Sequence, residues 1–339
     1  MDMRVTVRSP LRVDFVGMTD YVPACEEFGG SIINATINKY IYAQLALRDD
    51  EKIVLNAPDQ DDVRVEVASA AELDSAGELG LAQEILRRFE LSSGVELTTY
   101  SEMPAGAGLG SSSTIATCII AALDAATGYG LTAYEMAEMA RDCETVALNT
   151  TYGWQDQYSP VTGGGLKFMR HWPKTSGRGI EIDIIPLDVA AVAQIEKSMV
   201  VCYSGISRPA KSILDAVAAG VSSGDEEVVN ALKGMSEVAD ELRRQFAGGE
   251  VAGAGAMLTE AWKLHKRLHP DVTNERLEQL FEAAMNAGAT GGRVCGAGGG
   301  GAMVFFAGSG REYAVRRALG EMDARVFDCN IDTHGLIRW

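Results

Sequence analysis

Hydrophobic and polar positions divide the first half of the chain into short alternating segments and longer helical ones. Alternation with a period of two predicts strands at residues 4–7, 11–16, 40–47, 63–67 and 95–100. Apolar positions recur every three to four residues at 78–89, 113–126 and 133–148, which predicts three helices. The second of these is apolar nearly all round and should be buried. The third begins with Thr132 and Glu135 at the spacing of a capping box.

The pattern changes after about residue 179. A predicted strand at 199–203 is followed by an almost entirely helical stretch over 210–287, and Gly288 stands where a left-handed helix cap is expected. Strands at 292–295 and 302–307 flank a run of glycines, and a helix at 312–322 precedes terminal strands. We therefore expect an α+β protein of two domains, residues 1–190 and 191–339, without internal repeats.

Composition narrows the range of partners. The formal net charge is -17 and no long basic run exists, which disfavours nucleic acid and anionic membranes as partners. The longest apolar run is too short to span a bilayer, and the first residues lack the pattern of a secretory signal. The six cysteines are scattered without zinc spacing and are interpreted as reduced, mostly buried thiols. We expect a cytoplasmic protein that acts on a small molecule, and a homodimer is compatible with this sequence.

The most informative segment is PAGAGLGSSS at residues 104–113, between the strand ending near 100 and the buried helix. Glycines let backbone N–H groups approach an anion, and a helix N-terminus adds partial positive charge. A Walker loop is excluded because its lysine is missing. The segment is either a phosphate-binding loop or a turn with a serine cap, and its alternating glycines favour the first. Its candidate ligands are Pro104, Gly106, Gly108, Leu109, Gly110, Ser111, Ser112 and Ser113.

A second glycine loop, GAGGGG at residues 296–301, contains the letters of a dinucleotide fingerprint. That fingerprint must open a helix, whereas a strand is predicted directly after this loop, which excludes a Rossmann site. The loop is either a hairpin turn or a surface that closes against a ligand. Its pairing with the first loop favours ligand contact by Gly296, Gly298 and Gly299.

Together with SPLRVDFVGMTD at residues 9–20, the two loops resemble the three ordered motifs of the GHMP kinases. QDQY at 155–158, YSGISR at 203–208 and AWKLHK at 261–266 are similar to the heptose 7-phosphate kinase branch. The resemblance covers essentially the whole chain. It implies an N-terminal domain like domain 2 of ribosomal protein S5, a ferredoxin-like C-terminal domain and ATP beneath the first loop. GMTD at 17–20 departs from the GEHTD and GGGTD forms of related kinases. This difference leaves the identity of the substrate open.

The resemblance also implies catalytic roles. Asp156 matches the aspartate that orients and deprotonates the acceptor hydroxyl, and Arg12 matches the basic residue that stabilises developing charge. Glu144 and a hydroxyl of Ser112 match the Mg²⁺ ligands, whose hard oxygen atoms suit that ion. Each also has an ordinary alternative. Asp156 equally suits a solvated loop carboxylate, Arg12 a surface arginine at a strand edge, and Glu144 an exposed helix carboxylate.

Substrate ligands are expected at Thr19, Asp20, Gly30, Gln155, Arg208 and Lys266. A carboxylate at position 20 accepts two sugar hydroxyls at once, although it equally suits a cap of the next turn. The basic clusters at 207–211 and 263–267 either anchor a phosphate on the substrate, through Arg208 and Lys266, or form solvated helix faces.

These features predict an ATP- and Mg²⁺-dependent kinase that phosphorylates a hydroxyl, the anomeric one, of a sugar phosphate such as a heptose 7-phosphate. One alternative is a kinase of an unphosphorylated sugar, amino sugar or cyclitol. Another is a noncatalytic sensor of ATP and sugar. The presence of Arg12, Glu144 and Asp156 argues against the sensor.

Overall fold

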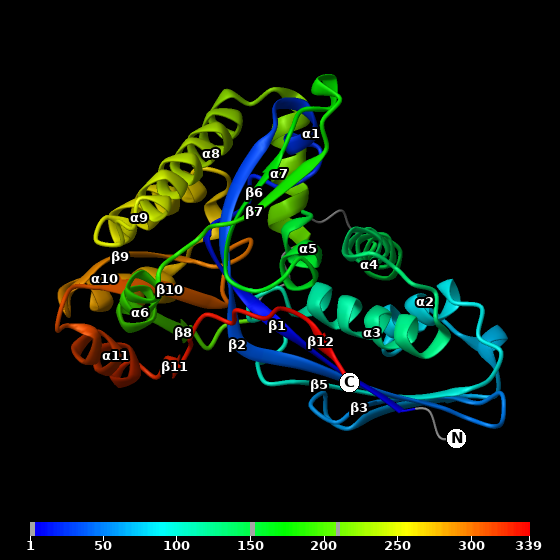
Figure 1. Ribbon diagram of the computed structural model, residues 1–339. Coiled ribbons are helices and arrows are strands. Elements are labelled where there is room, and N and C mark those ends of the chain that lie inside the picture. The colour runs from blue at the N-terminus through cyan, green and yellow to red at the C-terminus, as the bar shows by residue number, and fades with distance from the viewer. Residues whose placement is uncertain (1–3, 150–152, 208–210) are drawn as a thin grey trace.

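The computed structural model describes residues 4–149, 153–207 and 211–339, which form two helix-covered sheets (Figure 1). The larger sheet has the strand order β12-β1-β2-β5-β3-β4, and β6 joins β2 to β7. Its pairings are antiparallel except for β3 with β5. These strands are β1 (Arg4–Val16), β2 (Gly30–Leu47), β3 (Ile53–Ala57), β4 (Val63–Val67), β5 (Val95–Ser101), β6 (Leu166–His171), β7 (Ile180–Ile184) and β12 (Ile337–Arg338).

Strands β1 and β2 are the two longest strands of this sheet. The two strands predicted at 4–7 and 11–16 are one strand, whose register against β2 shifts between Pro10 and Arg12 and again between Asp14 and Val16. Such irregularities redirect side chains and are frequent next to active sites. The first half of β2 pairs with β6 and the second half with β5. Only the second half was predicted, because residues 30–37 are buried on both faces and do not alternate.

Several helices pack on the larger sheet. The long helix α3 (Ser111–Thr127) packs between strands β1 and β2 and helix α4 (Ala133–Leu148). This confirms the predicted buried helix, and the capping box of Thr132 and Glu135 is also confirmed. The remaining elements of this part are α1 (Ala24–Phe28), η1 (Ala70–Glu72), α2 (Gly80–Arg88), α5 (Gln155–Val161) and η2 (Lys174–Ser176).

The smaller sheet is antiparallel with the order β11-β8-β10-β9. Its strands are β8 (Met199–Tyr203), β9 (Ala289–Val294), β10 (Ala302–Ala307) and β11 (Arg325–Phe327). Its helices are α6 (Val189–Ser198), α7 (Lys211–Ser223), α8 (Glu226–Ala247), α9 (Ala254–Lys266), η3 (Pro270–Val272), α10 (Glu275–Asn286) and α11 (Glu312–Glu321). Helix α9 packs on β9 while α8 packs on β2 of the larger sheet, so this helix pair bridges the two sheets.

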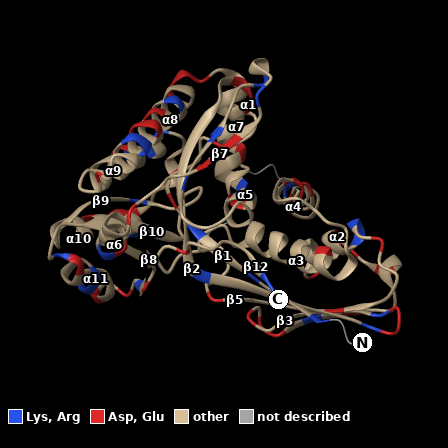
Figure 2. Cartoon of the chain, viewed as in Figure 1, with Lys and Arg blue, Asp and Glu red and all other residues tan. Residues whose placement is uncertain are grey.

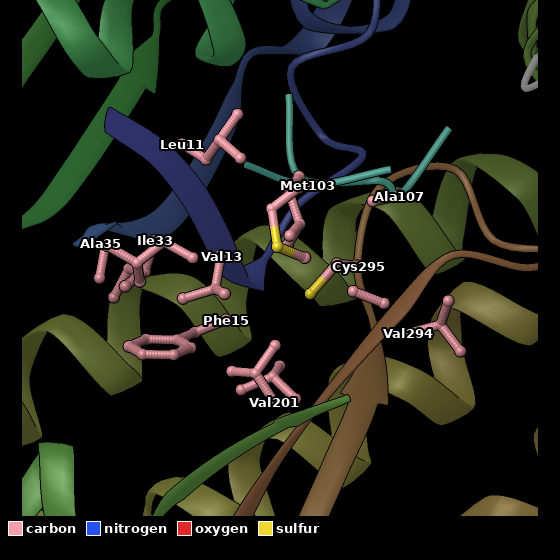
Figure 3. Packing of buried hydrophobic residues seen from close by; sticks show 14 of the residues in the cluster. Leu11, Val13, Phe15, Ile33, Ala35, Met103, Ala107, Val201, Val294 and Cys295 are labelled. Atoms are coloured by element: carbon pink, nitrogen blue, oxygen red, sulfur yellow. The ribbon is translucent and has the colours of Figure 1, made fainter. Parts of the chain in front are cut away.

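One hydrophobic cluster joins the two halves. Figure 3 shows Val13 and Phe15 of β1 near Val201 of β8, with Ala107 of the first glycine loop and Val294 of β9 in the same cluster. All five are fully or almost fully buried. Because burial of apolar side chains is the main stabilising term in folding, both glycine loops are anchored at this shared core.

Charged side chains concentrate on outer helices such as α8 and α11, whereas α3 is almost free of them (Figure 2). All six cysteines are unpaired and buried, which confirms their predicted state. Among the helices of the described ranges, none has the length and apolar character required to cross a membrane.

Candidate active site

A cavity of about 360 Å³ opens where the two glycine loops meet α5. The predicted site residues that line it are Arg12, Asp20, Gly106, Gly108, Gly110, Ser111, Ser112, Ser113, Gln155, Asp156, Gly296 and Gly298. The fold therefore brings the three sequence motifs and the segment at 155–158 to one place.

The first glycine loop has the backbone of an anion site. Gly106, Gly108 and Gly110 have φ values of 72°, 72° and 78°, a region that favours glycine. Gly110 directly precedes α3, so the positive end of this 17-residue helix faces the cavity. The buried hydroxyl oxygen of Ser111 has no hydrogen-bond partner within the described residues. An anionic ligand would satisfy it.

The second glycine loop packs backbone to backbone on the first. The N–H of Ala302 donates to the carbonyl of Ala107 at 2.7 Å. A Cβ atom on Gly108 would lie 2.9 Å from the carbonyl oxygen of Cys295, so glycine is required for the approach. The loop connects the antiparallel strands β9 and β10 and also lines the cavity, so it is both a hairpin turn and a wall of the site.

Asp156 and Arg12 form the centre of the site. Asp156 lies in the first turn of α5, and its two carboxylate oxygens accept hydrogen bonds from Arg12 Nε at 2.7 Å and Nη2 at 2.9 Å. Arg12 Nη1 donates to the carbonyl of Gly108 in the first loop at 2.6 Å. Burial alone would lower the pKa of Arg12, but the charges of Asp156 and Asp14 outweigh it and raise that pKa above its usual value. The arginine is thus a permanent cation.

A cluster of oxygen atoms lies at the start of α3. The Glu144 carboxylate is buried on α4 and accepts hydrogen bonds from the hydroxyls of Ser112 and Ser113 and, at 2.6 Å, from Gln157 Nε2. Burial raises the pKa of Glu144, and these hydrogen bonds partly oppose the rise. Hydroxyl and carboxylate oxygens next to an anion-binding loop are the donor set that Mg²⁺ prefers, so these residues fit that ion.

Asp20 also lines the cavity. Its Oδ2 accepts the backbone N–H groups of Trp154 and Gln155, both at 3.1 Å. Burial, and then the charge of Asp156, raise the pKa of Asp20 to about 6. Asp20 therefore accepts N–H groups at the start of α5, rather than in the turn that follows it in sequence, and it also lines the cavity.

A second cavity, of about 570 Å³, shares Gly106, Ser111 and Ser112 with the first. Its wall combines apolar side chains with polar groups from β3, α2 and β5: Leu55, Asn56, Gln60, Leu79, Leu81, Leu97 and Thr99. Sequence reasoning missed these residues because no motif links them. The position of Met103 and Pro104 could have indicated this cavity, because these residues connect β5 to the first glycine loop and line the same space.

Some predicted ligands support the cavity from outside. The Thr19 hydroxyl donates to the carbonyl of Ser31 at 2.6 Å, and a Cβ atom on Gly30 would collide with the carbonyl oxygen of Thr19. Leu109 is buried in the core, where its carbonyl accepts the N–H of Arg12 at 3.2 Å. These residues fix the backbone of the motifs.

Two more predicted residues lie elsewhere, and a third is outside the described residues. Gly299 donates its N–H to Val272 at 2.7 Å and turns toward η3. Within the described residues, Lys266 does not line the cavity. Its Nζ donates a hydrogen bond to Glu278 at 3.0 Å and lies over the ring of Trp262. Arg208 lies outside the described residues.

Two sequence families match the chain. The GHMP kinases N terminal domain matches residues 79–164, which contain the first glycine loop, Glu144 and Asp156. The GHMP kinases C terminal domain matches residues 235–324, which contain the second glycine loop.

Individual sugar kinases are similar to this chain over nearly its whole length. The D-glycero-alpha-D-manno-heptose 7-phosphate kinase of Campylobacter jejuni is 28% identical over 99% of this chain and 98% of its own length. The bifunctional fucokinase/GDP-fucose pyrophosphorylase of Arabidopsis thaliana is 27% identical over 97% of this chain and 32% of its own length. The crystal structure of a D-glycero-D-manno-heptose 1-phosphate kinase from Bacteroides thetaiotaomicron superposes with a TM-score of 0.81 and 25% identity, covering 99% of this chain and 98% of the other. The motifs, the fold and both matched domains agree: this chain belongs to the GHMP kinases and has their two-domain fold.

Proposed function

We propose that this kinase transfers the γ-phosphate of ATP to the anomeric hydroxyl of a heptose 7-phosphate or a related sugar phosphate. The observation that carries the proposal is the Asp156–Arg12 pair, held against the first glycine loop at the N-terminus of α3. This arrangement supports the proposal because an anion-binding loop and a carboxylate able to accept a proton line the same cavity.

In this proposal the nucleotide occupies the two cavities that share lining residues. The apolar wall of the larger cavity suits a purine and its ribose, and the shared residues Gly106, Ser111 and Ser112 lie where its phosphates would pass into the smaller one. Backbone N–H groups and the helix terminus stabilise phosphate charge without moving. In this proposal residues 1–190 hold the nucleotide and residues 191–339 close over it.

Asp156 supports the acceptor side. It receives the proton of the sugar hydroxyl as the oxygen–phosphorus bond forms and the bond from the γ-phosphorus to ADP breaks. Arg12 keeps the carboxylate pointed at the cavity and offsets the negative charge that gathers there. Asp20 and Gln155, which line the same cavity, accept hydroxyls of the sugar.

Ser112 and Glu144 would hold the Mg²⁺ ion, which supplies charge neutralisation between phosphates when bound. Ser113 and Gln157 donate hydrogen bonds to Glu144 and so keep its carboxylate oriented beside Ser112. A kinase that draws on ATP also suits the cytoplasmic location expected from the sequence.

The identity of the sugar rests on the heptose 7-phosphate kinase of Campylobacter jejuni and on the sequence motifs. An unphosphorylated sugar is the second candidate. It is favoured by the pairing of Lys266 with Glu278, which removes one of the two expected phosphate anchors, and by the similarity to the Arabidopsis fucokinase.

An ADP-release assay with Mg²⁺-ATP separates the candidates. The acceptors are D-glycero-D-manno-heptose 7-phosphate, the same heptose without its phosphate, and L-fucose, with Asp156→Asn as the background. Turnover of the phosphorylated heptose alone supports the proposal, and preference for either free sugar replaces it with the second candidate. Binding of ATP and sugar without turnover would identify a sensor.

A further inference from the structure

A buried chain of charged and polar groups runs behind the active site and is not used by the proposed chemistry. Asp14 lies on β1 between Val13 and Phe15, which belong to the hydrophobic cluster that joins the two sheets. Its side chain is completely buried. Burying a carboxylate is costly unless it is paired, so its partners show what it does.

The partners of Asp14 come from both ends of the site. Its Oδ1 accepts the N–H of Gly296, the first residue of the second glycine loop, at 3.1 Å. The same oxygen lies 3.9 Å from Nη1 of Arg12, and Oδ2 lies 3.4 Å from Nη2 of Arg293. The Asp14 carboxylate thus lies next to Arg12, the cation that holds Asp156, and also binds the backbone of the second glycine loop.

Arg293 extends this chain on β9. Its guanidinium is completely buried and donates to the carbonyls of Val294 at 3.0 Å and Phe15 at 3.4 Å. Nη2 lies 3.3 Å from Nδ1 of His265, whose Nε2 lies 3.2 Å from the carbonyl of Ala297. Arg293 therefore binds β1, β9 and α9 simultaneously.

The hydrogen-bond roles are determined by the partners. Arginine only donates and a carbonyl only accepts, so His265 accepts at Nδ1 and donates from Nε2 to Ala297. This is the neutral form of the ring. Burial and the charge of Arg293 lower the pKa of His265, which keeps it neutral.

The second glycine loop is consequently held at two successive residues. Asp14 fixes the N–H of Gly296, and the neutral His265 fixes the carbonyl of Ala297. Both loop residues line the cavity. The same chain of contacts ends on Arg12, so the loop and the catalytic pair share one scaffold.

Stability alone is a weak reason for such a group, because buried ion pairs are often replaced by apolar residues without loss. On the basis of the kinase activity proposed above, we propose that Asp14 and Arg293 are positioning residues that hold the second glycine loop and Arg12 in one fixed arrangement. They align Arg12 with Asp156 and keep the loop in place over the phosphates.

Asp14→Asn and Arg293→Met test this proposal, alone and combined. The Asp14→Asn substitution preserves the shape of the side chain and an acceptor for Gly296 but removes the charge. We expect each single variant to lower kcat by about tenfold or more, with the KM for ATP changed less than about threefold, because alignment acts on the transition state. The double variant should be no worse than the poorer single variant, since the two residues act as a unit.

Asp124→Asn is the matched control. Asp124 is also buried, accepts a backbone N–H from Leu131 at 2.8 Å and pairs with Arg338 at 2.7 Å, but it lies outside the cavity lining within the described residues. A loss of stability without a change in kcat is expected there. If Asp14→Asn keeps kcat within about twofold of the wild type, or if the two single effects multiply in the double variant, the positioning role is wrong.

Amide hydrogen exchange gives a readout that does not depend on turnover. Arg293→Met should accelerate exchange in the segment 295–301 relative to both the wild type and Asp124→Asn, and Arg293→Lys should have an intermediate effect. Unchanged exchange in Arg293→Met would overturn the proposal. Failure of the wild type to phosphorylate any sugar would count against the proposed function and leave this measurement valid.

Discussion

The guanidinium of Arg12 and the carboxylate of Asp156 meet through two parallel hydrogen bonds, Nε to Oδ1 at 2.7 Å and Nη2 to Oδ2 at 2.9 Å. The arginine side chain is 3% exposed and the aspartate 26% exposed. The buried cation therefore lies behind the carboxylate and sets the direction in which the carboxylate faces the cavity. This planar, two-point contact fixes orientation as well as charge.

Arg12→Lys should consequently be far from conservative. Lysine keeps the charge, but a single ammonium cannot hold both carboxylate oxygens and the carbonyl of Gly108 in one plane. We expect kcat to fall by about 10- to 100-fold with a small change in the KM for ATP. Steady-state kinetics measure this, with Arg243→Lys as the control because Arg243 pairs with the exposed Asp183. A kcat within about threefold of the wild type would show that charge alone suffices.

Asp20→Asn should make the protein more stable at neutral pH. The pKa of Asp20 is raised from 3.8 to about 6 by burial and by Asp156, so between these pH values the folded state binds more protons than the unfolded state. Stability therefore falls as pH rises through this window. Removing the charge should recover on the order of 1–3 kcal/mol at neutral pH and less at acidic pH within the window, as measured by urea unfolding. An equal gain at both pH values would contradict the argument.

The same substitution should weaken sugar binding. The asparagine side chain offers one acceptor oxygen instead of two, so the KM for the sugar should rise by about tenfold or more while ATP binding is kept. In the wild type, sugar affinity should decline as pH falls through about 6, because protonation removes the negative charge and turns one of the two acceptor oxygens into a donor. That pH dependence should vanish in Asp20→Asn. Its persistence would assign the titration to another group.

The elements predicted well from sequence are those with a clear period or a strong local signal. Strands β8 and β10 and helix α4 have the predicted bounds, since a short continuous apolar run marks each of the strands and a capping box marks the helix. The first half of β2 and strands β3, β6 and β7 were missed. Residues 30–37 are buried on both faces, and no local signal reveals that α8 and β6 will cover them.

The site shows a similar division. The glycine loops are recognisable because backbone approach and positive φ demand glycine, whatever the rest of the fold does. Arg12 and Asp156 are 144 positions apart, and their pairing was predictable only through a family resemblance. Lys266 suggested a phosphate anchor by its charge, but the fold places Glu278 within 3.0 Å of it. Asp14 and Arg293 gave no signal, because a buried ion pair between domains depends on how those domains meet.

Glu144→Gln should change the Mg²⁺ dependence more than the fold. Glutamine matches glutamate in shape and hydrogen-bonds to Ser112 and Gln157, but it is a poorer ligand for a hard cation. We expect the Mg²⁺ concentration for half-maximal rate to rise by about tenfold or more. Glu138→Gln on the same helix is the control, since Glu138 is half-exposed and contacts Tyr158 and Arg141. An unchanged Mg²⁺ titration would remove Glu144 from the metal site.

Gly110→Ala and Gly128→Ala separate backbone strain from crowding of the catalytic carboxylate. These glycines cap the two ends of α3 with nearly equal φ values of 78° and 73°. An alanine at either position carries the same left-handed strain, which costs about 1 kcal/mol. Their surroundings differ. A Cβ atom on Gly110 would lie 3.2 Å from Cγ of Asp156, whereas none of the described atoms lies within 4 Å of a Cβ atom on Gly128.

Both variants should therefore unfold at a similarly reduced urea concentration, but only Gly110→Ala should lose activity. We expect its kcat to fall by about tenfold or more, because the methyl group displaces Asp156 from the line between acceptor and phosphate. Gly128→Ala should retain the wild-type kcat. Equal loss of kcat in both would mean that strain in α3, transmitted along the helix, controls the rate. Full activity in Gly110→Ala would mean that Asp156 tolerates displacement, which its two-point contact with Arg12 argues against.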